Sequence, residues 1–308
     1  MQIQWYPGHM HKASKELQQI LPSVDLIIEV LDARIPFSSQ NPMLASIRGN
    51  KPCIKILNKD DLADESRTQQ WQDHLEQQNG IKTLAVNMSH PERIKQLTHL
   101  CHKMVVGKKS SDRPLNAVIM GIPNVGKSTL INILAGRAIA KTGNEPAVTK
   151  GQQRIALKEH NILLFDTPGM LWGNIENINS GYRLAATGAI KDTAMDIDDV
   201  GFFTAEYLLQ EYPQQIMDRY QLIYRPTSEL ELLEALGKKR GCLRSGGIVD
   251  LVKASKILLT ELRAGILGRI TLEMPRMMEQ ELKETAILTE QKEQKKVARK
   301  ARRKKNRR

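Results

Sequence analysis

Cysteine is scarce in this sequence, and its distribution excludes two kinds of protein. Only Cys53, Cys101 and Cys242 occur among 308 residues, and none of them forms a Cys-x-x-Cys pair. An odd number of widely spaced thiols argues against a disulfide framework and against a cysteine zinc site. We therefore expect three inert, buried thiols, which suit the reducing cytoplasm.

Long apolar runs are also missing. No stretch approaches the roughly 18 consecutive apolar residues that a transmembrane helix needs. The N-terminus lacks the basic start and the apolar core of a secretory signal. With 41% hydrophobic and 26% charged residues, the composition is typical of a soluble globular chain. These features predict a cytoplasmic protein without a membrane partner.

Positive charge is concentrated at one end of the chain. The net charge is +12, and residues 291–308 supply +10 of it, with eleven Lys or Arg and one Glu. We predict a disordered polybasic tail there, either a solvated end or an arm that binds nucleic acid. The arm is favoured because charge this dense is costly without a polyanionic partner. A membrane surface is disfavoured, since the tail has almost no apolar face.

Short apolar runs alternate with helical patterns in the first half of the chain. The runs lie at 24–31, 53–57, 84–86, 115–120 and 161–165. This alternation predicts a mostly parallel sheet with helices on both faces, interrupted by a polar linker at 107–114.

After about residue 176 the strand signal fades and helical patterns take over. Asp198 or Asp199 is a candidate N-cap for one helix. Ser228 and Glu231 match a capping box for the next helix, and Gly237 is its expected end. The second half is therefore predicted to be all helical.

Residues 121–128 read Gly-Ile-Pro-Asn-Val-Gly-Lys-Ser, which is the pattern of a phosphate-binding loop. An apolar run precedes it and a helical pattern follows, whereas a glycine-rich turn with an ordinary surface lysine needs neither. Lys127 is expected to reach the β- and γ-phosphates and the Ser128 hydroxyl to bind Mg²⁺. The predicted residues of this loop are Asn124, Val125, Gly126, Lys127, Ser128 and Thr129.

Two further residue groups fit the phosphate side of a nucleotide site. Asp166-Thr-Pro-Gly169 follows a strand, so Asp166 is placed to hold Mg²⁺ through water and the Gly169 N–H to contact the γ-phosphate. Thr149 lies between the two motifs and is a candidate Mg²⁺ ligand in a nucleotide-sensitive switch. Taken alone, Thr149 reads as a loop threonine.

The motif Asn58-Lys-x-Asp61 follows another strand and suits the base. A carboxylate at Asp61 accepts from the ring N–H and the amino group of guanine, and adenine leaves it unpaired. Asn58 and the Lys59 stem would brace this loop and cover the base. After the strand at 84–86, the residues Asn87, Met88 and Ser89 are candidates for backbone contacts to the base edge.

The order of these motifs is unusual, because Asn58-Lys-x-Asp61 precedes the phosphate loop. Over residues 1–290 the chain resembles the circularly permuted GTPases, and among them the ribosome biogenesis GTPase A family. The segments that carry the resemblance are 5–10, 31–36, 58–61, 121–128, 166–169 and 185–192. The family has the 32–36 segment as a signature, to which the sequence assigns no chemistry. Three alternatives stay open for Arg34: contact with the nucleotide region, with the partner, or only within its own fold.

The resemblance implies an α/β fold of the P-loop NTPase type, with a mostly parallel sheet in a circularly permuted G domain at 1–176. A helical RNA- and ribosome-binding domain is expected at 177–290, before the basic disordered tail at 291–308. It also implies a GTP-hydrolysing factor in late maturation of the large (50S) ribosomal subunit, whose partners are the subunit precursor and its rRNA.

Three rival functions remain open. The first is a P-loop kinase or metabolic enzyme, which the motif at 58–61 and the absence of an acceptor-substrate motif oppose. The second is a GTPase that acts on another RNA such as tRNA. The third is a GTP-dependent RNA-binding protein with little catalysis.

Many GTPases have a glutamine directly after Asp-x-x-Gly, but this chain has Met170. The resemblance gives His9 a role in catalysis, against the simpler view that His9 caps or packs the first helix. Asn124 matches an asparagine associated with K⁺ in potassium-stimulated GTPases, or it only braces its own loop. The partner is the third candidate to complete the site. We therefore expect slow intrinsic turnover that a partner stimulates.

Overall fold

The apolar runs of the first half form one sheet in the computed structural model, which describes residues 15–105, 113–140, 153–172 and 175–305. Its strands are β1 (Leu26–Asp32), β2 (Cys53–Asn58), β3 (Ile81–Val86), β4 (Leu115–Gly121), β5 (Gln153–Leu157) and β6 (Ile162–Asp166). They lie in the order β3-β2-β1-β4-β6-β5, and every neighbouring pair is parallel except β5 with β6. The predicted α/β fold with a mostly parallel sheet is confirmed.

The edge strand β5 was not predicted from the sequence. Only Ile155 and Leu157 are buried in it, while Gln153, Arg154 and Ala156 are exposed. A short strand with only two buried apolar residues gives almost no hydrophobic signal in the sequence. The antiparallel pairing of β5 with β6 stabilises this strand.

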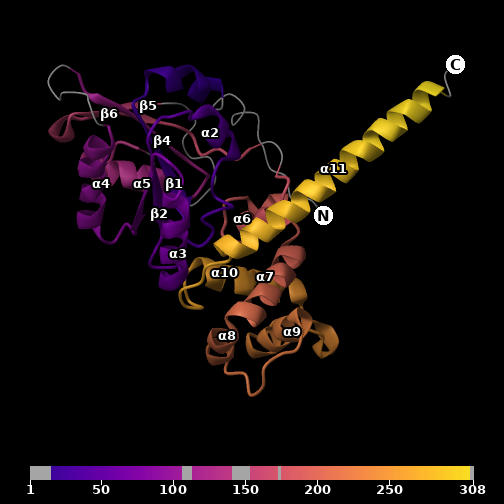
Figure 1. Ribbon diagram of the computed structural model, residues 1–308. Helices are drawn as coiled ribbons and strands as arrows, with labels where there is room; N and C mark the ends of the chain where they lie inside the picture. The colour runs from indigo at the N-terminus through magenta and orange to yellow at the C-terminus, as the bar shows by residue number, and fades with distance from the viewer. Residues whose placement is uncertain (1–14, 106–112, 141–152, 173–174, 306–308) are drawn as a thin grey trace.

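Helices cover both faces of the sheet (Figure 1). They are α2 (Pro42–Ile47), α3 (Glu65–Glu76), α4 (Pro91–Met104) and α5 (Lys127–Ala135). Side chains alternate along a strand, so Ile28 and Val30 of β1 lie in one core with residues of α4 and α5. Ile27 lies in a second core with Leu44 of α2, and Leu31 in a third with residues of α3.

The second half of the described chain is helical, as predicted. Its helices are α6 (Ile178–Ala186), α7 (Ile197–Glu211), α8 (Pro213–Tyr220), α9 (Glu229–Lys239), α10 (Leu251–Arg263) and α11 (Pro275–Lys305). The N-cap of α7 is Asp196 rather than Asp198 or Asp199, because the Asp196 side chain accepts from the Asp198 N–H. The Ser228 side chain caps α9 as expected, by accepting from the Glu231 N–H.

Gly237 does not end its helix, contrary to our expectation. Helix α9 continues to Lys239, and a Cβ on Gly237 would lie 2.3 Å from Cγ1 of Val249. The glycine therefore serves close packing. The left-handed turn after the helix falls instead at Gly241, with φ +67°.

The predicted disorder of residues 291–308 is wrong for the part that the structure describes. Helix α11 runs without a break from Pro275 to Lys305 and extends away from the rest of the protein (Figure 1). No glycine or proline follows Pro275, and Ala, Lys, Arg, Gln and Glu dominate the segment. These are strong helix formers, and their propensity outweighs the charge argument for a disordered tail.

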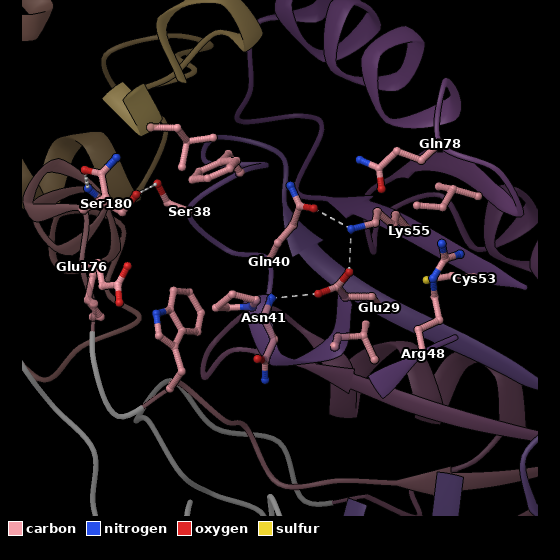
Figure 2. A pocket seen from close by; sticks show the side chains of 18 of the residues that line it. Glu29, Ser38, Gln40, Asn41, Arg48, Cys53, Lys55, Gln78, Glu176 and Ser180 are labelled. Atoms are coloured by element: carbon pink, nitrogen blue, oxygen red, sulfur yellow. Dashed lines mark hydrogen bonds and ion pairs between the residues drawn. The ribbon is translucent and has the colours of Figure 1, made fainter. Parts of the chain in front are cut away.

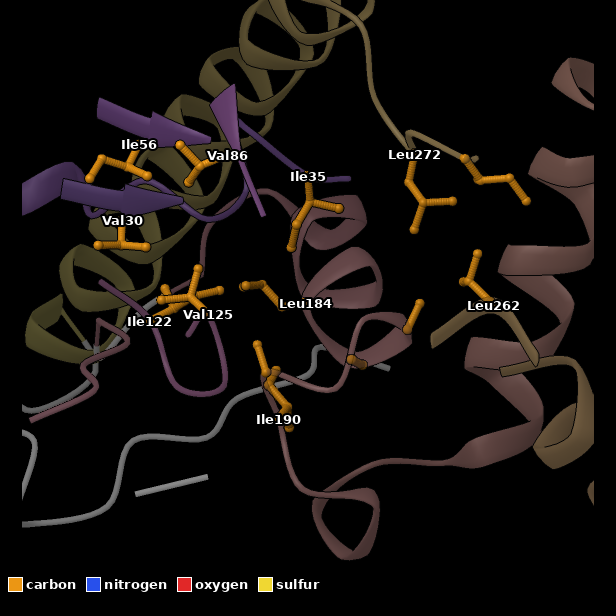
Figure 3. Close-up of a cluster of buried hydrophobic side chains, with 14 of the residues drawn as sticks. Val30, Ile35, Ile56, Val86, Ile122, Val125, Leu184, Ile190, Leu262 and Leu272 are labelled. Carbon is orange, nitrogen blue, oxygen red and sulfur yellow. The ribbon is translucent and has the colours of Figure 1, made fainter. Parts of the chain in front are cut away.

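One apolar core joins the sheet to the second-half helices (Figure 3). Val30 and Ile56 of the sheet belong to the same cluster as Leu184 of α6 and Leu262 of α10, with Ile35 in the loop between them. The helices therefore pack against the edge of the sheet at which β1 and β2 end.

All three cysteines are free and buried, which confirms the prediction of buried thiols. Burial raises the pKa of the Cys53 and Cys101 thiols to about 12, so both stay protonated near neutral pH. Among the described residues, no helix is both long and apolar enough to cross a membrane.

Candidate functional site

The predicted site residues follow strands that end at one edge of the sheet. Asn58 ends β2, Gly121 ends β4 and Asp166 ends β6, while Asn87 comes directly after β3. Because these strands are parallel, their carboxyl ends bring the loops together, which is where open α/β sheets bind ligands.

Two glycines give the phosphate-binding loop its shape. A Cβ on Gly121 would lie 2.4 Å from the carbonyl oxygen of Val30, so only glycine fits there. Gly126 has a φ of +95°, and a Cβ on it would lie 2.3 Å from Nδ2 of Asn58. Helix α5 begins at the next residue, Lys127, so its N-terminal N–H groups and dipole face the loop. This geometry suits a bound phosphate.

Lys127 and Asp166 form a buried, opposite-charged pair beside the loop. Burial lowers the pKa of Lys127 to about 8, although Asp166 opposes the shift. Burial likewise raises the pKa of Asp166 to about 6, and Lys127 opposes that shift. Lys127 Nζ donates to the Gly121 carbonyl at 3.3 Å, and neither carboxylate oxygen of Asp166 has a hydrogen-bond partner. The Lys127 ammonium suits a phosphate, and the two carboxylate oxygens of Asp166 suit a cation.

The residues of this edge also fit Mg²⁺. The two Asp166 oxygens are buried without hydrogen-bond partners, and Ser128 offers a hydroxyl in the first turn of α5. Carboxylate and hydroxyl oxygens are the ligands that Mg²⁺ prefers. A Cβ on Gly169 would lie 3.4 Å from Lys127 Nζ, so the Gly169 backbone reaches the same place. Thr149 lies outside the described residues.

Hydrogen bonds join the 58–61 loop to its neighbours. Nδ2 of Asn58 donates to the Val125 carbonyl oxygen of the phosphate-binding loop at 2.7 Å. Nδ2 of Asn87 donates to Oδ1 of Asp60 at 2.6 Å, so this side chain holds the 58–61 loop. Met88 lies close to Gly126, whose added Cβ would be 3.7 Å from the Met88 Cε. The structure thus brings three separated segments of the chain together.

Asp32 and Arg34 lie near this loop, although no chemistry could be assigned to them from the sequence. Arg34 donates to Asp32 from Nε at 2.9 Å and from Nη2 at 2.7 Å, and Lys59 Nζ lies 2.8 Å from the same carboxylate. Only the position of Asp32 could have indicated its place in the site, because Asp32 ends β1 at the same edge of the sheet as Asn58.

The candidate catalytic residues have different positions. Met170 is 2% exposed, and its N–H donates to the Gly121 carbonyl, so its side chain belongs to the core. Nδ2 of Asn124 donates to the Gly188 carbonyl at 2.9 Å, just after α6. His9 lies outside the described residues.

A cavity of about 610 Å³ lies elsewhere, between the sheet, α2, α6 and α11 (Figure 2). A buried ion pair lines it, with Lys55 Nζ 2.9 Å from Glu29, and Gln40 and Asn41 hydrogen-bond to this pair. None of the predicted nucleotide residues is among the lining residues. The buried pair instead fastens the 36–42 segment to the sheet.

Comparisons with known proteins agree with this arrangement. A family model described as a 50S ribosome-binding GTPase matches residues 116–220. Ribosome biogenesis GTPase A of Priestia megaterium is 43% identical over 290 residues, which cover 92% of this chain and 100% of that protein. The chain belongs to the ribosome biogenesis GTPase A family. The Thermotoga maritima member is 33% identical over 273 residues, and the matched region covers 89% of this chain and 95% of that protein.

Two solved structures share the fold over most of this chain. A GDP-bound YlqF has a TM-score of 0.61 at 27% identity, covering 85% of this chain and 99% of that one. The GNP-bound YlqF of T. maritima has a TM-score of 0.59 at 28% identity, covering 86% and 98%. The shared part therefore includes helices beyond the sheet, and the resemblance stated from the motifs is confirmed.

Proposed function

We propose that this chain binds and hydrolyses GTP as an assembly factor for the large (50S) ribosomal subunit, late in its maturation. The observation that carries the proposal is the hydrogen bond from Asn58 to Val125, which ties a base-reading loop to a phosphate-binding loop. Relatives named for ribosome biogenesis support the ribosomal part, as does the mitochondrial ribosome-associated GTPase 1 of Mus musculus, which is 33% identical over 296 residues.

Each side chain then has an assigned task. Lys127 contacts the β- and γ-phosphates, and Asp61 accepts from the guanine base. Ser128 and Thr149 bind Mg²⁺ directly and Asp166 through water, while the Gly169 N–H contacts the γ-phosphate. The remaining nucleotide contacts come from Asn58, Lys59, Asn87, Met88, Ser89, Asn124, Val125, Gly126 and Thr129.

Catalysis needs a group that orients the attacking water. The buried side chain of Met170 does not do this, so we assign the task to His9. Asn124 is our candidate K⁺ ligand, through its side-chain oxygen. Intrinsic turnover is then slow and rises on the ribosomal particle.

Ribosomal RNA is the proposed partner of the helical domain at 177–290 and of the basic end at 291–308. The protein then acts in the cytoplasm, where subunits mature. Helix α11 supports the assignment, because it carries the basic residues away from the sheet on one continuous helix (Figure 1). Neutralised phosphates make such binding strong and dependent on salt.

Sedimentation of cell extract with a nonhydrolysable GTP analogue tests the proposal. We expect the protein to sediment with a large-subunit precursor, and the Lys127→Ala variant to stay at the top of the gradient. The matched control is Lys82→Ala, since Lys82 is an exposed partner of Glu76 and should change nothing. Sedimentation with tRNA alone, or with no ribosomal particle, would contradict the proposal.

The buried Met170 also favours a second candidate, a GTP-dependent RNA-binding protein with little catalysis. Phosphate release, measured with K⁺ and purified large-subunit precursors both present, separates the two. Turnover that stays undetectable there while GTP still binds would establish this alternative.

A further inference from the structure

Residues 32–34 connect the base-reading loop to the helical half of the protein. Asp32 is the last residue of β1 and lies opposite Asn58, the last residue of β2. The N–H of Ala33 donates to the Asn58 carbonyl at 2.8 Å. The segment is therefore joined to the loop that reads the base by backbone as well as side-chain contacts.

The carboxylate of Asp32 is the centre of a buried charge cluster. It accepts two parallel hydrogen bonds from the Arg34 guanidinium, at 2.9 and 2.7 Å, one from the Arg34 backbone N–H at 3.0 Å and one from Lys59 Nζ at 2.8 Å. Two-point pairing of this kind fixes orientation as well as charge. Burial opposes ionisation, yet the two cations outweigh it and hold the pKa of Asp32 well below its usual range. Asp32 therefore stays ionised and keeps Lys59 in place.

The backbone of Lys59 adds to the case. Its φ is +64°, a left-handed conformation that residues other than glycine seldom adopt. Such conformations persist where the surroundings hold them, and they gather at functional sites. The contact with Asp32 provides that hold, and Lys59 precedes Asp61 by only two residues.

Arg34 extends the connection to α6 and to the segment before α11. Its Nη2 donates to the Thr187 carbonyl at 3.4 Å, at the C-terminal end of α6, and its own carbonyl accepts from the Leu272 N–H at 2.8 Å. Asn124 of the phosphate-binding loop donates to the neighbouring Gly188 carbonyl. The end of α6 is thus held from both the base side and the phosphate side.

We propose that Asp32 and Arg34 are positioning residues for guanine recognition, which hold Lys59 and Asp61 in register with the base and connect that loop to the end of α6. The proposal rests on the function assigned above, since it needs Asp61 to read guanine. A purely structural role for the same contacts would weaken the binding of all nucleotides equally. A positioning role weakens guanine nucleotides selectively.

The test compares affinities for GDP and ADP in Asp32→Asn, Arg34→Lys and the unaltered protein. We expect the GDP preference to fall by at least about tenfold in Asp32→Asn, with ADP affinity unchanged. Arg34→Lys keeps the charge but loses the two-point pairing, so its preference should fall less. If the unaltered protein does not prefer GDP, the proposed function fails. If it does and both variants keep that preference, only the positioning role fails.

Arg67→Gln is the matched control. Arg67 also joins the sheet half to the helical half, through Glu211 at 2.6 Å and the Thr271 carbonyl at 3.0 Å, but it does not contact Lys59. Its GDP preference should stay within about twofold of the unaltered protein. A loss equal to that of Asp32→Asn would show that any weakened contact between the halves is sufficient, and would overturn the proposal.

Hydrogen exchange on the unaltered protein tests the same idea without a destabilising substitution. GDP should slow exchange in residues 32–39 and at 187–188, whereas inorganic triphosphate, which has no base, should slow it only around 121–128. Unchanged exchange at 32–39 with GDP bound, or equal protection by triphosphate, would overturn the proposal.

Discussion

Asn58 and Val125 are 67 positions apart in sequence, and the Asn58 side chain donates a 2.7 Å hydrogen bond to the Val125 carbonyl. This bond keeps the base loop and the phosphate loop in one register, although a permuted chain order separates them. Oδ1 of Asn58 is buried without a partner of its own, so the residue is kept here at some energetic cost.

Asn58→Ala should therefore weaken GDP binding by about 1–3 kcal/mol, because it removes a buried hydrogen bond and loosens both loops. Calorimetric titration with GDP checks this value. Asn116→Ala is the control, since its Nδ2 donates to the Ser23 carbonyl at the start of β4, away from the loops. Equal losses in the two variants would contradict the link between the loops.

Asp61→Asn should change which base the protein prefers. An amide in place of the carboxylate no longer accepts two hydrogen bonds from guanine, but it can donate to the extra carbonyl of xanthine. We expect GDP affinity to fall by at least about a hundredfold and XDP affinity to rise above it. Competition between the two diphosphates against a fluorescent nucleotide measures the change, and a retained guanine preference would remove Asp61 from base reading.

Asp166→Asn should stabilise the nucleotide-free protein near neutral pH. The native carboxyl keeps its proton up to about pH 6, whereas the ordinary pKa is 3.8, so stability falls as pH rises through that window. The substitution removes this loss, which is worth about 1–3 kcal/mol above the window and nothing below it.

Urea unfolding without nucleotide or Mg²⁺, at about pH 4 and about pH 7.5, measures the Asp166 effect. The control is Asp73→Asn, which alters an exposed carboxylate on α3 away from the site. A variant less stable than the unaltered protein at the higher pH would refute the explanation from burial.

Most of the sheet and the convergence of its loops were predictable, because both follow from local patterns. Strands such as Cys53–Asn58 are short, mostly apolar segments that are buried along their whole length, and the carboxyl ends of parallel strands must meet at one edge. The permuted motif order was also visible in the sequence. Strand β5 was missed because its stability comes from pairing with β6 and not from its own residues.

Contacts between distant parts of the chain produce the structural features that local sequence patterns do not predict. The bond from Arg34 to Thr187 spans 153 positions, and no local pattern in residues 31–36 indicates it. The sequence around Gly237 predicts a helix end, because the close contact with Val249 that requires the glycine is tertiary and leaves no local pattern. The helix through residues 291–305 replaces the expected disordered end for a different reason, because the helix propensity of its residues outweighs the repulsion between their charges.

Deleting residues 291–308 should lower RNA affinity and its dependence on salt. The segment carries eleven Lys or Arg. If about half of these contact phosphates, the slope of log K against log salt concentration should become less steep by about 4. Filter binding of large-subunit rRNA at several KCl concentrations gives the slope.

A second variant replaces the same basic residues with glutamine, which preserves helix propensity and chain length and removes only the charge. Equal losses in the two variants attribute the effect to phosphate contacts, whereas an unchanged slope in both would exclude the basic end from RNA binding.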